Sequence, residues 1–237
     1  NAHPGLANRI LSYFVDKSYL VFGDATKYLK SKNNLVLGMP LRSEIEDYTA
    51  NTVKKSIFTI LCFGGSQGSV FLNDKISDFV LQNPEVASKL KVIHQTGSRD
   101  FKRMQEKYKN NTSVEIHEYI YEMPKYYNQA DLLFCRGGAS TLAEAAAFGV
   151  VPIVVPLPAA DDHQQRNAEA LVRENAGIMF LQTDFDSEQF KQQIAKLIQD
   201  KSVLNEMSGR LKQIVTKGAA GKIAQDILDT VHASQNK

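Results

Sequence analysis

Short apolar runs alternate with amphipathic stretches along most of the chain. The first long run, Ile57–Phe63, is nearly continuously apolar, which is typical of a strand buried on both faces of a parallel sheet. The stretch after it, 70–80, carries apolar side chains at helical spacing. The further predicted strands are 91–94, 114–117, 132–134, 152–155 and 178–181, and the further predicted helices are 99–107, 123–129, 142–148, 163–174, 187–199, 203–216 and 222–232.

Strands that alternate with helices at these lengths predict right-handed crossovers. The expected fold class is therefore α/β, with a doubly wound, Rossmann-like parallel sheet flanked by helices. Ligands of such sheets bind beyond the C-terminal ends of the strands. Two glycine turns, Gly64–Gly68 and Arg136–Gly138, fall at such ends. We therefore expect the two turns to face one crevice.

The front of the chain has a different pattern. Leu6, Ile10 and Phe14 would share one face of a helix, and two short apolar runs after them predict two strands. This is too little structure to fold alone, and the chain begins without Met. We expect residues 1–42 to be the tail of a preceding domain with its linker, residues 43–237 to form a separate domain, and the chain to be a fragment.

Composition narrows the function classes. The chain has 237 residues, 43% of them hydrophobic and 23% charged, which is ordinary for a soluble globular protein. Its formal net charge is +2, so no basic field argues for nucleic acid. No apolar run of about 20 residues predicts a transmembrane helix, and no signal peptide is visible. We expect Cys62 and Cys135, each at the end of an apolar run, to be buried free thiols in a reducing cytoplasm.

The stretch 135–149 is the first candidate for a ligand site. A predicted strand turns on two glycines into an Ala- and Leu-rich helix, which Ser140 and Thr141 are suited to cap. Bare N–H groups and the helix dipole favour an anion there. Glu144 lies about one turn inside the helix, where a carboxylate suits neutral hydroxyls such as a ribose diol. The stretch predicts a bound nucleotide, although such turns also occur for packing reasons alone.

The turn Gly64–Gly68 fits a second anion site. Its sequence matches neither the G-x-G-x-x-G nor the G-x-x-x-x-G-K-[ST] pattern. Ser66 can donate its hydroxyl, and Ser66, Gln67 and Gly68 can offer backbone N–H groups. Asn73 lies two helical turns beyond Ser66. It would either reach the mouth of the same crevice or be a solvated helix residue.

Acidic residues and histidines elsewhere support weaker hypotheses. Asp184 and Asp186 have a D-x-D spacing that can hold a metal, but Asp186 is better explained as a helix cap. The turn 161–164 would cap a helix or line the crevice. No Ser/His/Asp or Cys/His nucleophile system can be assembled. Three histidines are expected at the surface or at strand edges: His94, His117 and His232.

Four ordered motifs resemble those of MurG-type N-acetylglucosaminyltransferases. They are Gly64–Gly68, His94–Gly97, Cys135–Glu144 and Asp161–Ala168. The segments 1–8 and 38–42 are similar to that family too, so the resemblance spans nearly the whole chain. Two positions depart from the family pattern: Gly137 stands where Ser is common, and Met39 where Asn is frequent.

The resemblance implies a two-domain GT-B glycosyltransferase whose C-terminal domain binds UDP-N-acetylglucosamine. Such enzymes transfer N-acetylglucosamine to a lipid-linked muramyl-pentapeptide, lipid I, held by the N-terminal domain. The product, lipid II, serves peptidoglycan and cell wall synthesis, and so cell shape and cell division. The implied enzyme is cytoplasmic, peripheral on the inner face of the bacterial cell membrane, and needs no metal cofactor. The family's catalytic base would precede Asn1, so we expect no catalytic residue in this chain.

The resemblance also assigns contacts with the donor. It places Glu144 at the ribose hydroxyls, and Ser66 with its turn at the pyrophosphate. Ile120 would meet the uracil through its backbone and side chain, and Gln164 would bind the sugar hydroxyls. Two residues of the front segment would reach the donor from the side of the other domain. The complete expected set is Asn1, Arg42, Ser66, Gln67, Gly68, Asn73, Ile120, Met123, Arg136, Gly138, Ser140, Thr141, Glu144, His163 and Gln164.

Two alternative functions stay open. The chain could belong to another GT-B transferase or to a UDP-N-acetylglucosamine 2-epimerase, which share the fold and the ribose carboxylate. The different glycine turns of the epimerases weaken that hypothesis. The chain could also be a non-catalytic module that binds a nucleotide sugar, as a sensor or a partner subunit.

Overall fold

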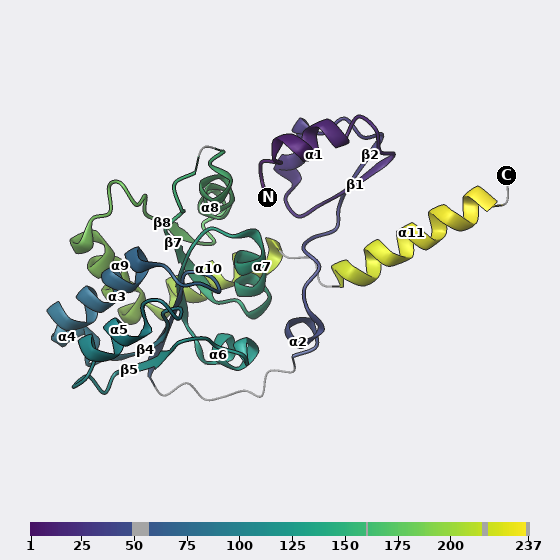
Figure 1. Cartoon of the computed structure of the whole chain (residues 1–237). Coiled ribbons are helices and arrows are strands. Elements are labelled where there is room, and N and C mark those ends of the chain that lie inside the picture. Colours follow the sequence, from purple (N-terminus) through teal and green to yellow (C-terminus); the bar gives the residue numbers. More distant parts are fainter. Residues whose placement is uncertain (49–56, 160, 215–217, 236–237) are drawn as a thin grey trace.

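A six-stranded parallel sheet forms the centre of the protein (Figure 1). The structure, a computed structural model, describes residues 1–48, 57–159, 161–214 and 218–235. The strand order is β5-β4-β3-β6-β7-β8, with every neighbouring pair parallel. The strands are β3 (Phe58–Phe63), β4 (Leu90–Gln95), β5 (Val114–His117), β6 (Leu132–Cys135), β7 (Val151–Val154) and β8 (Ile178–Met179). The doubly wound sheet expected from the sequence is confirmed.

Helices cover both faces of this sheet. The sheet helices are α3 (Val70–Gln82), α4 (Pro84–Ala87), α5 (Phe101–Lys107), α6 (Met123–Gln129), α7 (Ala139–Phe148), α8 (His163–Arg173), α9 (Ser187–Gln199) and α10 (Lys201–Ile214). Side chains alternate between the faces along each strand. Ile60 and Cys62 of β3 therefore pack with α3, α5 and α9, whereas Leu61 and Phe63 pack with α6 and α7. The complete burial of β3 explains its continuous apolar run.

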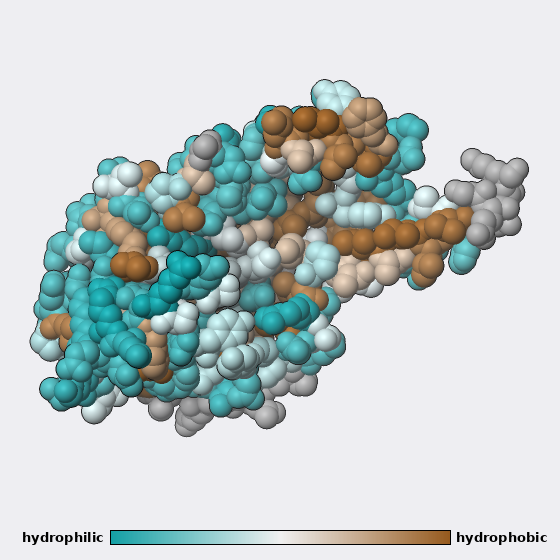
Figure 2. Space-filling view, in the orientation of Figure 1, coloured by the Kyte–Doolittle hydropathy of each residue, from teal (hydrophilic) through white to brown (hydrophobic). Residues whose placement is uncertain are grey.

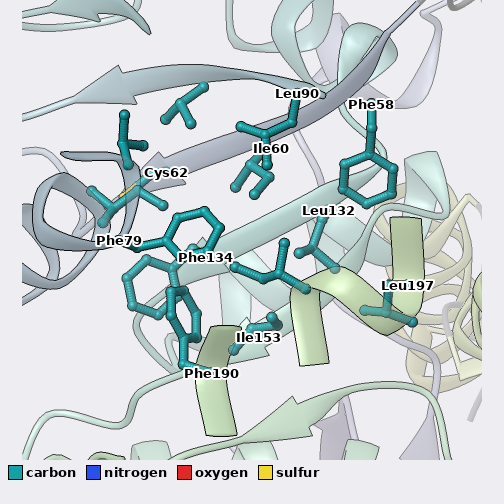
Figure 3. Packing of buried hydrophobic residues seen from close by; sticks show 14 of the residues in the cluster. Phe58, Ile60, Cys62, Phe79, Leu90, Leu132, Phe134, Ile153, Phe190 and Leu197 are labelled. Atoms are coloured by element: carbon teal, nitrogen blue, oxygen red, sulfur yellow. The ribbon is translucent and has the colours of Figure 1, made fainter. Parts of the chain in front are cut away.

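The core beneath α3 and α9 is rich in aromatic side chains (Figure 3). The rings of Phe134 and Phe190 lie 4.8 Å apart between centroids, and Phe79 meets Phe190 edge-on at 5.5 Å. Cys62 lies in this cluster, and Cys135 lies in the cluster on the other face. Both thiols are free and buried, as expected, and burial raises the pKa of each.

The front segment forms a small unit of its own. It contains α1 (Leu6–Leu11), a 3₁₀ helix η1 (Gly23–Tyr28), and a parallel two-stranded sheet of β1 (Lys17–Leu20) and β2 (Asn33–Val36). The C-terminal helix α11 (Ala219–Gln235) joins this unit through Asp226, which accepts hydrogen bonds from Lys17 and Tyr19. The C-terminal helix thus bonds to β1 of the front unit, whereas the first residues of the chain lie beside α8, where Ala2 N donates to Asn167 (Figure 1).

The predicted helix at the front is only partly correct. It ends at Leu11, and its apolar side chains face outward, with Leu6 64% and Phe14 81% exposed. Figure 2 shows these apolar side chains over α1 and others along α11. The periodicity therefore predicts the helix, but no other part of the described chain covers its apolar face.

Short elements mark the predicted domain boundary. The helix α2 (Ser43–Glu46) follows it, and Ile45 is buried beside α7. The residues after the boundary, 43–56, are mostly polar and charged, and 49–56 lie outside the described residues, as does the end of the helix predicted to reach Thr216. The boundary between residues 42 and 43 remains a prediction. No helix within the described ranges is long and apolar enough to cross a membrane.

Candidate functional site

The strand order places a switch point at the carboxyl ends of β3 and β6, where the sequence predicts the ligand crevice. From β3 the chain proceeds to β4 and β5 on one side, and it then returns to β6, β7 and β8 on the other side. The loops that leave β3 and β6 therefore run in opposite directions, although these strands are neighbours. Such a switch point is where ligands of open α/β sheets bind. Both predicted glycine turns lie there.

A hydrogen bond joins the turn after β6 to the residue that directly follows the turn after β3. Arg136, which follows β6, donates from Nη2 to Ser69 Oγ at 2.8 Å, and Ser69 is the N-cap of α3. Arg136 also donates from Nη1 to the carbonyls of Val155 and Pro156. The two turns are therefore neighbours in space, and the prediction that they face one crevice remains a prediction. The guanidinium of Arg136 thus bonds to the loop after β7 and to Ser69, which indicates that Arg136 positions the turns.

The N-terminus of α7 offers unpaired backbone donors. The helix begins at Ala139, and Gly138 serves as its N-cap with extended backbone angles and no side-chain cap. The prediction that Ser140 and Thr141 cap the helix is therefore wrong, because both lie inside its first turn. The amides of Ala139, Ser140 and Thr141 have no acceptor among the described residues. Such amides and the helix dipole favour an anion.

The turn after β3 offers a second set of donors. Ser66 and Gln67 are exposed, and their amides donate to no acceptor in the part of the chain that is described. The expectation for Gly68 is wrong, because its amide donates to Gly65 O at 3.1 Å within the turn. Gly68 has a positive φ, and a Cβ there would lie 1.8 Å from Thr96 O. Only glycine fits this close approach.

Glu144 lies in a largely closed position beside the crevice. Its side chain is 16% exposed, and its Oε1 lies 3.8 Å from Arg42 Nη2. Its Oε2 accepts a hydrogen bond from the buried Tyr127 hydroxyl at 3.2 Å. Burial raises the pKa of Glu144, and Arg42 and the Tyr127 hydroxyl oppose that rise. Of the residues expected at the ligand, Arg42 and Glu144 are thus brought together.

Asn73 does not reach the crevice mouth, and it is not a solvated residue either. It is fully buried, and its Nδ2 donates to Thr96 O at 3.0 Å and to Asp100 Oδ2 at 2.7 Å. Both expectations for Asn73 are therefore wrong. Its carboxamide holds the loop after β4, whose residue Gly97 packs against Gly68 and Gln67 of the turn after β3.

His94 is a partner of Asn73 and is also fully buried, which corrects its expected surface position. Its Nε2 lies 2.9 Å from Asn73 Oδ1, and its Nδ1 lies 3.1 Å from the Tyr108 hydroxyl. Both donors of Asn73 are used, so Oδ1 must accept and His94 Nε2 must carry the proton. Burial lowers the pKa of His94 to about 3, and the imidazole is neutral.

Ile120 and Met123 line the core more than the crevice. Both are buried in one cluster with Tyr127. Ile120 is expected to meet the uracil through its backbone and side chain, but its backbone N–H group donates to Gln95 Oε1 at 2.8 Å. Two exposed rings flank Ile120, those of Tyr119 and Tyr121, which meet at 4.8 Å between centroids. The N–H group of Ile120 is therefore not available to the uracil. Contact of the uracil with the carbonyl or the side chain of Ile120 remains a prediction.

Gln164 connects the turn after β6 to the loop after β7. Its Oε1 accepts from the amides of Gly137 and Leu157, each at 3.0 Å. A Cβ on Gly137 would lie 2.4 Å from Gln164 O, so this turn needs its first glycine. A Cβ on Gly138 would meet only Thr141 Oγ1, at 3.7 Å. Gln164 thus ties the turn after β6 to the loop that precedes α8.

Asn167 is a residue that the sequence reasoning missed. It is fully buried, and its Nδ2 donates to Gly137 O and to Asn1 Oδ1. Its Oδ1 accepts from Ala2 N at 2.8 Å. Asn167 therefore fixes Asn1 beside the crevice. The sequence could have pointed to Asn167 through its place in the 161–168 motif, where it lies about one helical turn beyond Gln164.

The remaining polar candidates have ordinary structural roles. His163 Nδ1 lies 2.6 Å from Asp161 Oδ1, and this contact lowers the pKa of Asp161. Asp186 caps α9 by accepting from the amides of Glu188 and Gln189, as expected. His117 on the edge strand β5 and His232 on α11 have the expected partly or fully exposed positions. Across the described ranges no group of three metal-ligating side chains is found.

Comparison with known proteins identifies the family. The model of the glycosyltransferase family 28 C-terminal domain matches residues 59–227, which include all of the large sheet except Phe58. The chain belongs to glycosyltransferase family 28. A transferase of Bdellovibrio bacteriovorus, named UDP-N-acetylglucosamine--N-acetylmuramyl-(pentapeptide) pyrophosphoryl-undecaprenol N-acetylglucosamine transferase, is 49% identical over 96% of this chain and 64% of its own length. A Citrifermentans bemidjiense relative of the same name is 35% identical over 94% of this chain and 63% of its own length.

Solved structures agree with the family assignment. The crystal structure of Acinetobacter baumannii MurG matches with a TM-score of 0.78 and 28% identity, over 97% of this chain and 65% of that one. A Staphylococcus aureus MnaA–UDP structure shares the fold alone, with a TM-score of 0.69 and 13% identity, over 94% of this chain and 62% of that one. The fold is of the GT-B type. The chain spans less than two thirds of the length of its curated relatives.

Proposed function

We propose that this chain is the donor-binding part of a transferase that moves N-acetylglucosamine from UDP-N-acetylglucosamine to lipid I. The observation that carries the proposal is the junction of the two glycine turns through Arg136 and Ser69 at the switch point. That junction brings two sets of unpaired amides to one edge of the sheet, with Glu144 beside them. The printed names of the relatives supply the donor and the acceptor.

In this proposal the pyrophosphate lies between the two turns. The amides of Ser66 and Gln67 would face it from the turn after β3, and those of Ala139–Thr141 would face it from α7. The Ser66 hydroxyl would add a further donor. Glu144 would accept from the ribose hydroxyls, because a carboxylate is a strong acceptor for neutral O–H groups. Gln164, with His163 beside it, would bind the sugar.

The reaction would be one displacement with inversion at the anomeric carbon. A muramyl hydroxyl oxygen forms a bond to that carbon while the bond from the carbon to the UDP oxygen breaks. The hydroxyl proton passes to a base that we do not assign to any residue of this chain. Charge gathers on the departing diphosphate, where fixed amide dipoles stabilise it most. The donor set needs no metal or cofactor in this scheme.

The acceptor determines the place of action. The names of the relatives state that the acceptor carries pyrophosphoryl-undecaprenol, a long apolar lipid. We therefore infer a peripheral enzyme at the inner face of the cell membrane, in the branch of peptidoglycan synthesis that makes lipid II and supports cell shape and division. Contact with lipid I would involve parts of the protein that the relatives have beyond the length matched here.

Two measurements test the proposal. Calorimetric titration should show that the chain binds UDP and UDP-N-acetylglucosamine, and that Glu144→Ala weakens binding by about 1.5–3 kcal/mol, as for the loss of a charged hydrogen-bond partner.

A turnover assay with lipid-linked acceptor, on this chain and on the longer protein, separates an enzyme from a binding module. Ser66→Ala should lower turnover more than donor affinity, because the charge on the diphosphate grows in the transition state. Absence of UDP binding would refute the donor assignment.

A further inference from the structure

Gln95 connects two loops that lie on opposite sides of its own strand. It is the last residue of β4, which runs between β3 and β5, and it is 2% exposed. Its Nε2 donates to Gly65 O at 3.0 Å, in the turn after β3. Its Oε1 accepts from the Ile120 amide at 2.8 Å, in the loop after β5. One buried carboxamide therefore has both of its ends bonded to backbone groups of the crevice.

These bonds determine which way two peptide groups face. The described residues contain no cis peptide bond. In a planar trans peptide the carbonyl and the N–H group point to opposite sides. When Gly65 O points inward to Gln95, the amide of Ser66 must point away from Gln95, toward the exposed side of the turn. When the Ile120 amide points inward, the carbonyl of Tyr119 must point outward.

Side-chain packing does not hold the turn at this position. Gly65 has a φ of +90°, and a Cβ placed on it would meet no atom within 4 Å. Its carbonyl is held by the Gln95 carboxamide and by the amide of Gly68. By contrast, Gly68 is wedged against the backbone of Thr96. The orientation of the Gly65–Ser66 peptide thus depends on hydrogen bonds, and Gln95 supplies one from outside the turn.

We propose that Gln95 is a positioning residue that orients the phosphate-facing turn and the loop around Ile120 together, before ligand arrives. This inference rests on the proposed function, because it assigns to Gln95 the preparation of a site for a nucleoside diphosphate. Donors that already face the ligand bind it without a cost of reorganisation. Gln95 itself touches no ligand in this account.

Two substitutions separate this role from a general effect on folding. Gln95→Met keeps the approximate volume and removes both hydrogen bonds. Gln95→Glu keeps the length of the side chain, but its carboxylate cannot donate to Gly65 O until it is protonated. Burial raises the pKa of such a carboxyl, so protonation falls within reach of mildly acidic buffers. Gln105→Glu, on the exposed side of α5, controls for the added charge.

The experiment measures UDP dissociation constants by calorimetry at temperatures where each variant is folded by circular dichroism. We expect Gln95→Met to bind UDP about tenfold more weakly than the unmodified chain, because two hydrogen bonds are lost. We expect Gln95→Glu to bind weakly at pH 8 and to approach the affinity of the unmodified chain as the pH falls, with both compared at each pH. Gln105→Glu should match the unmodified chain throughout.

The outcomes are distinguishable. If the unmodified chain binds UDP and both folded Gln95 variants bind it equally well at every pH, the inference is overturned and the proposed function stands. If the unmodified chain does not bind UDP, the proposed function fails first. If Gln95→Met does not fold, the pH profile of Gln95→Glu decides: recovery on acidification supports the role, and a flat ratio contradicts it.

Discussion

The Tyr127 hydroxyl donates a hydrogen bond to Glu144 Oε2 at 3.2 Å. Tyr127 is fully buried, and its ring stacks on Phe148 of the same helix as Glu144, at 5.3 Å between centroids. The hydroxyl therefore fixes one carboxylate oxygen and leaves the other toward Arg42 and the crevice. This geometry fits the proposed role of Glu144 as the acceptor for the ribose hydroxyls.

Tyr127→Phe should weaken UDP binding while leaving the fold intact. The loss of one hydrogen bond to a carboxylate is worth about 1.5–3 kcal/mol in total, shared between stability and binding. Isothermal calorimetry measures the binding share, and urea unfolding measures the other. The matched control is Tyr126→Phe, which removes a hydroxyl that donates to Glu115 on the edge strand. Equal affinities in the two variants would show that Tyr127 has no role at the ligand.

The ionisation of Glu144 should appear in the pH profile of binding. Burial raises its pKa, so the carboxylate is lost at a higher pH than the ordinary value of about 4.3. As the pH falls through the raised pKa, the carboxylate proposed to accept from the ribose hydroxyls becomes protonated. We expect the ratio of UDP affinities between the unmodified chain and Glu144→Gln to be largest at neutral pH and to shrink on acidification. A ratio that stays constant down to pH 4.5 would contradict the ribose role.

Two adjacent glycines should respond differently to alanine. A Cβ on Gly137 would lie 2.4 Å from Gln164 O, whereas a Cβ on Gly138 would lie 3.7 Å from Thr141 Oγ1. Gly137→Ala must push two backbone segments apart, which we expect to cost about 1–3 kcal/mol of unfolding free energy. Gly138→Ala should cost clearly less. Chemical denaturation measures both, and a reversed order would mean that the turn differs from this geometry.

The buried His94 should make stability depend on pH. Its pKa is about 3 in the folded protein and about 6.5 when unfolded. Between these values the unfolded state binds the extra proton, so the unfolding free energy falls as the pH falls below 6.5. The slope from this one group is at most about 1.4 kcal/mol per pH unit. His94→Gln should flatten the profile between pH 6.5 and 4, and His232→Gln, on the exposed helix α11, should leave it unchanged.

The sequence predicts the sheet and the two glycine turns at its strand ends well, because both follow from local patterns. Apolar runs reveal buried strands such as β3, and glycines after a strand reveal a turn. It predicts the direction of individual polar side chains poorly. Asn73 and His94 look like surface residues in sequence, yet each satisfies the other inside the core. Such pairings join distant segments, and no local periodicity reports them.

Helix starts show the same limit on a smaller scale. Ser140 and Thr141 have the chemistry of caps, but the helix already begins at Ala139, so Gly138 takes the cap position two residues before Ser140. The outward face of α1 is a further case. Its spacing predicts a buried stripe, and burial depends on a partner surface that the pattern does not contain.

The central claim is that the two glycine turns bind one ligand together. The most direct test is a ¹⁵N–¹H NMR titration of the chain with UDP. The account predicts that the amide signals of Ser66 and Gln67 shift along the same saturation curve as those of Ala139, Ser140 and Thr141. Shifts confined to one turn, or two curves with different midpoints, would contradict it.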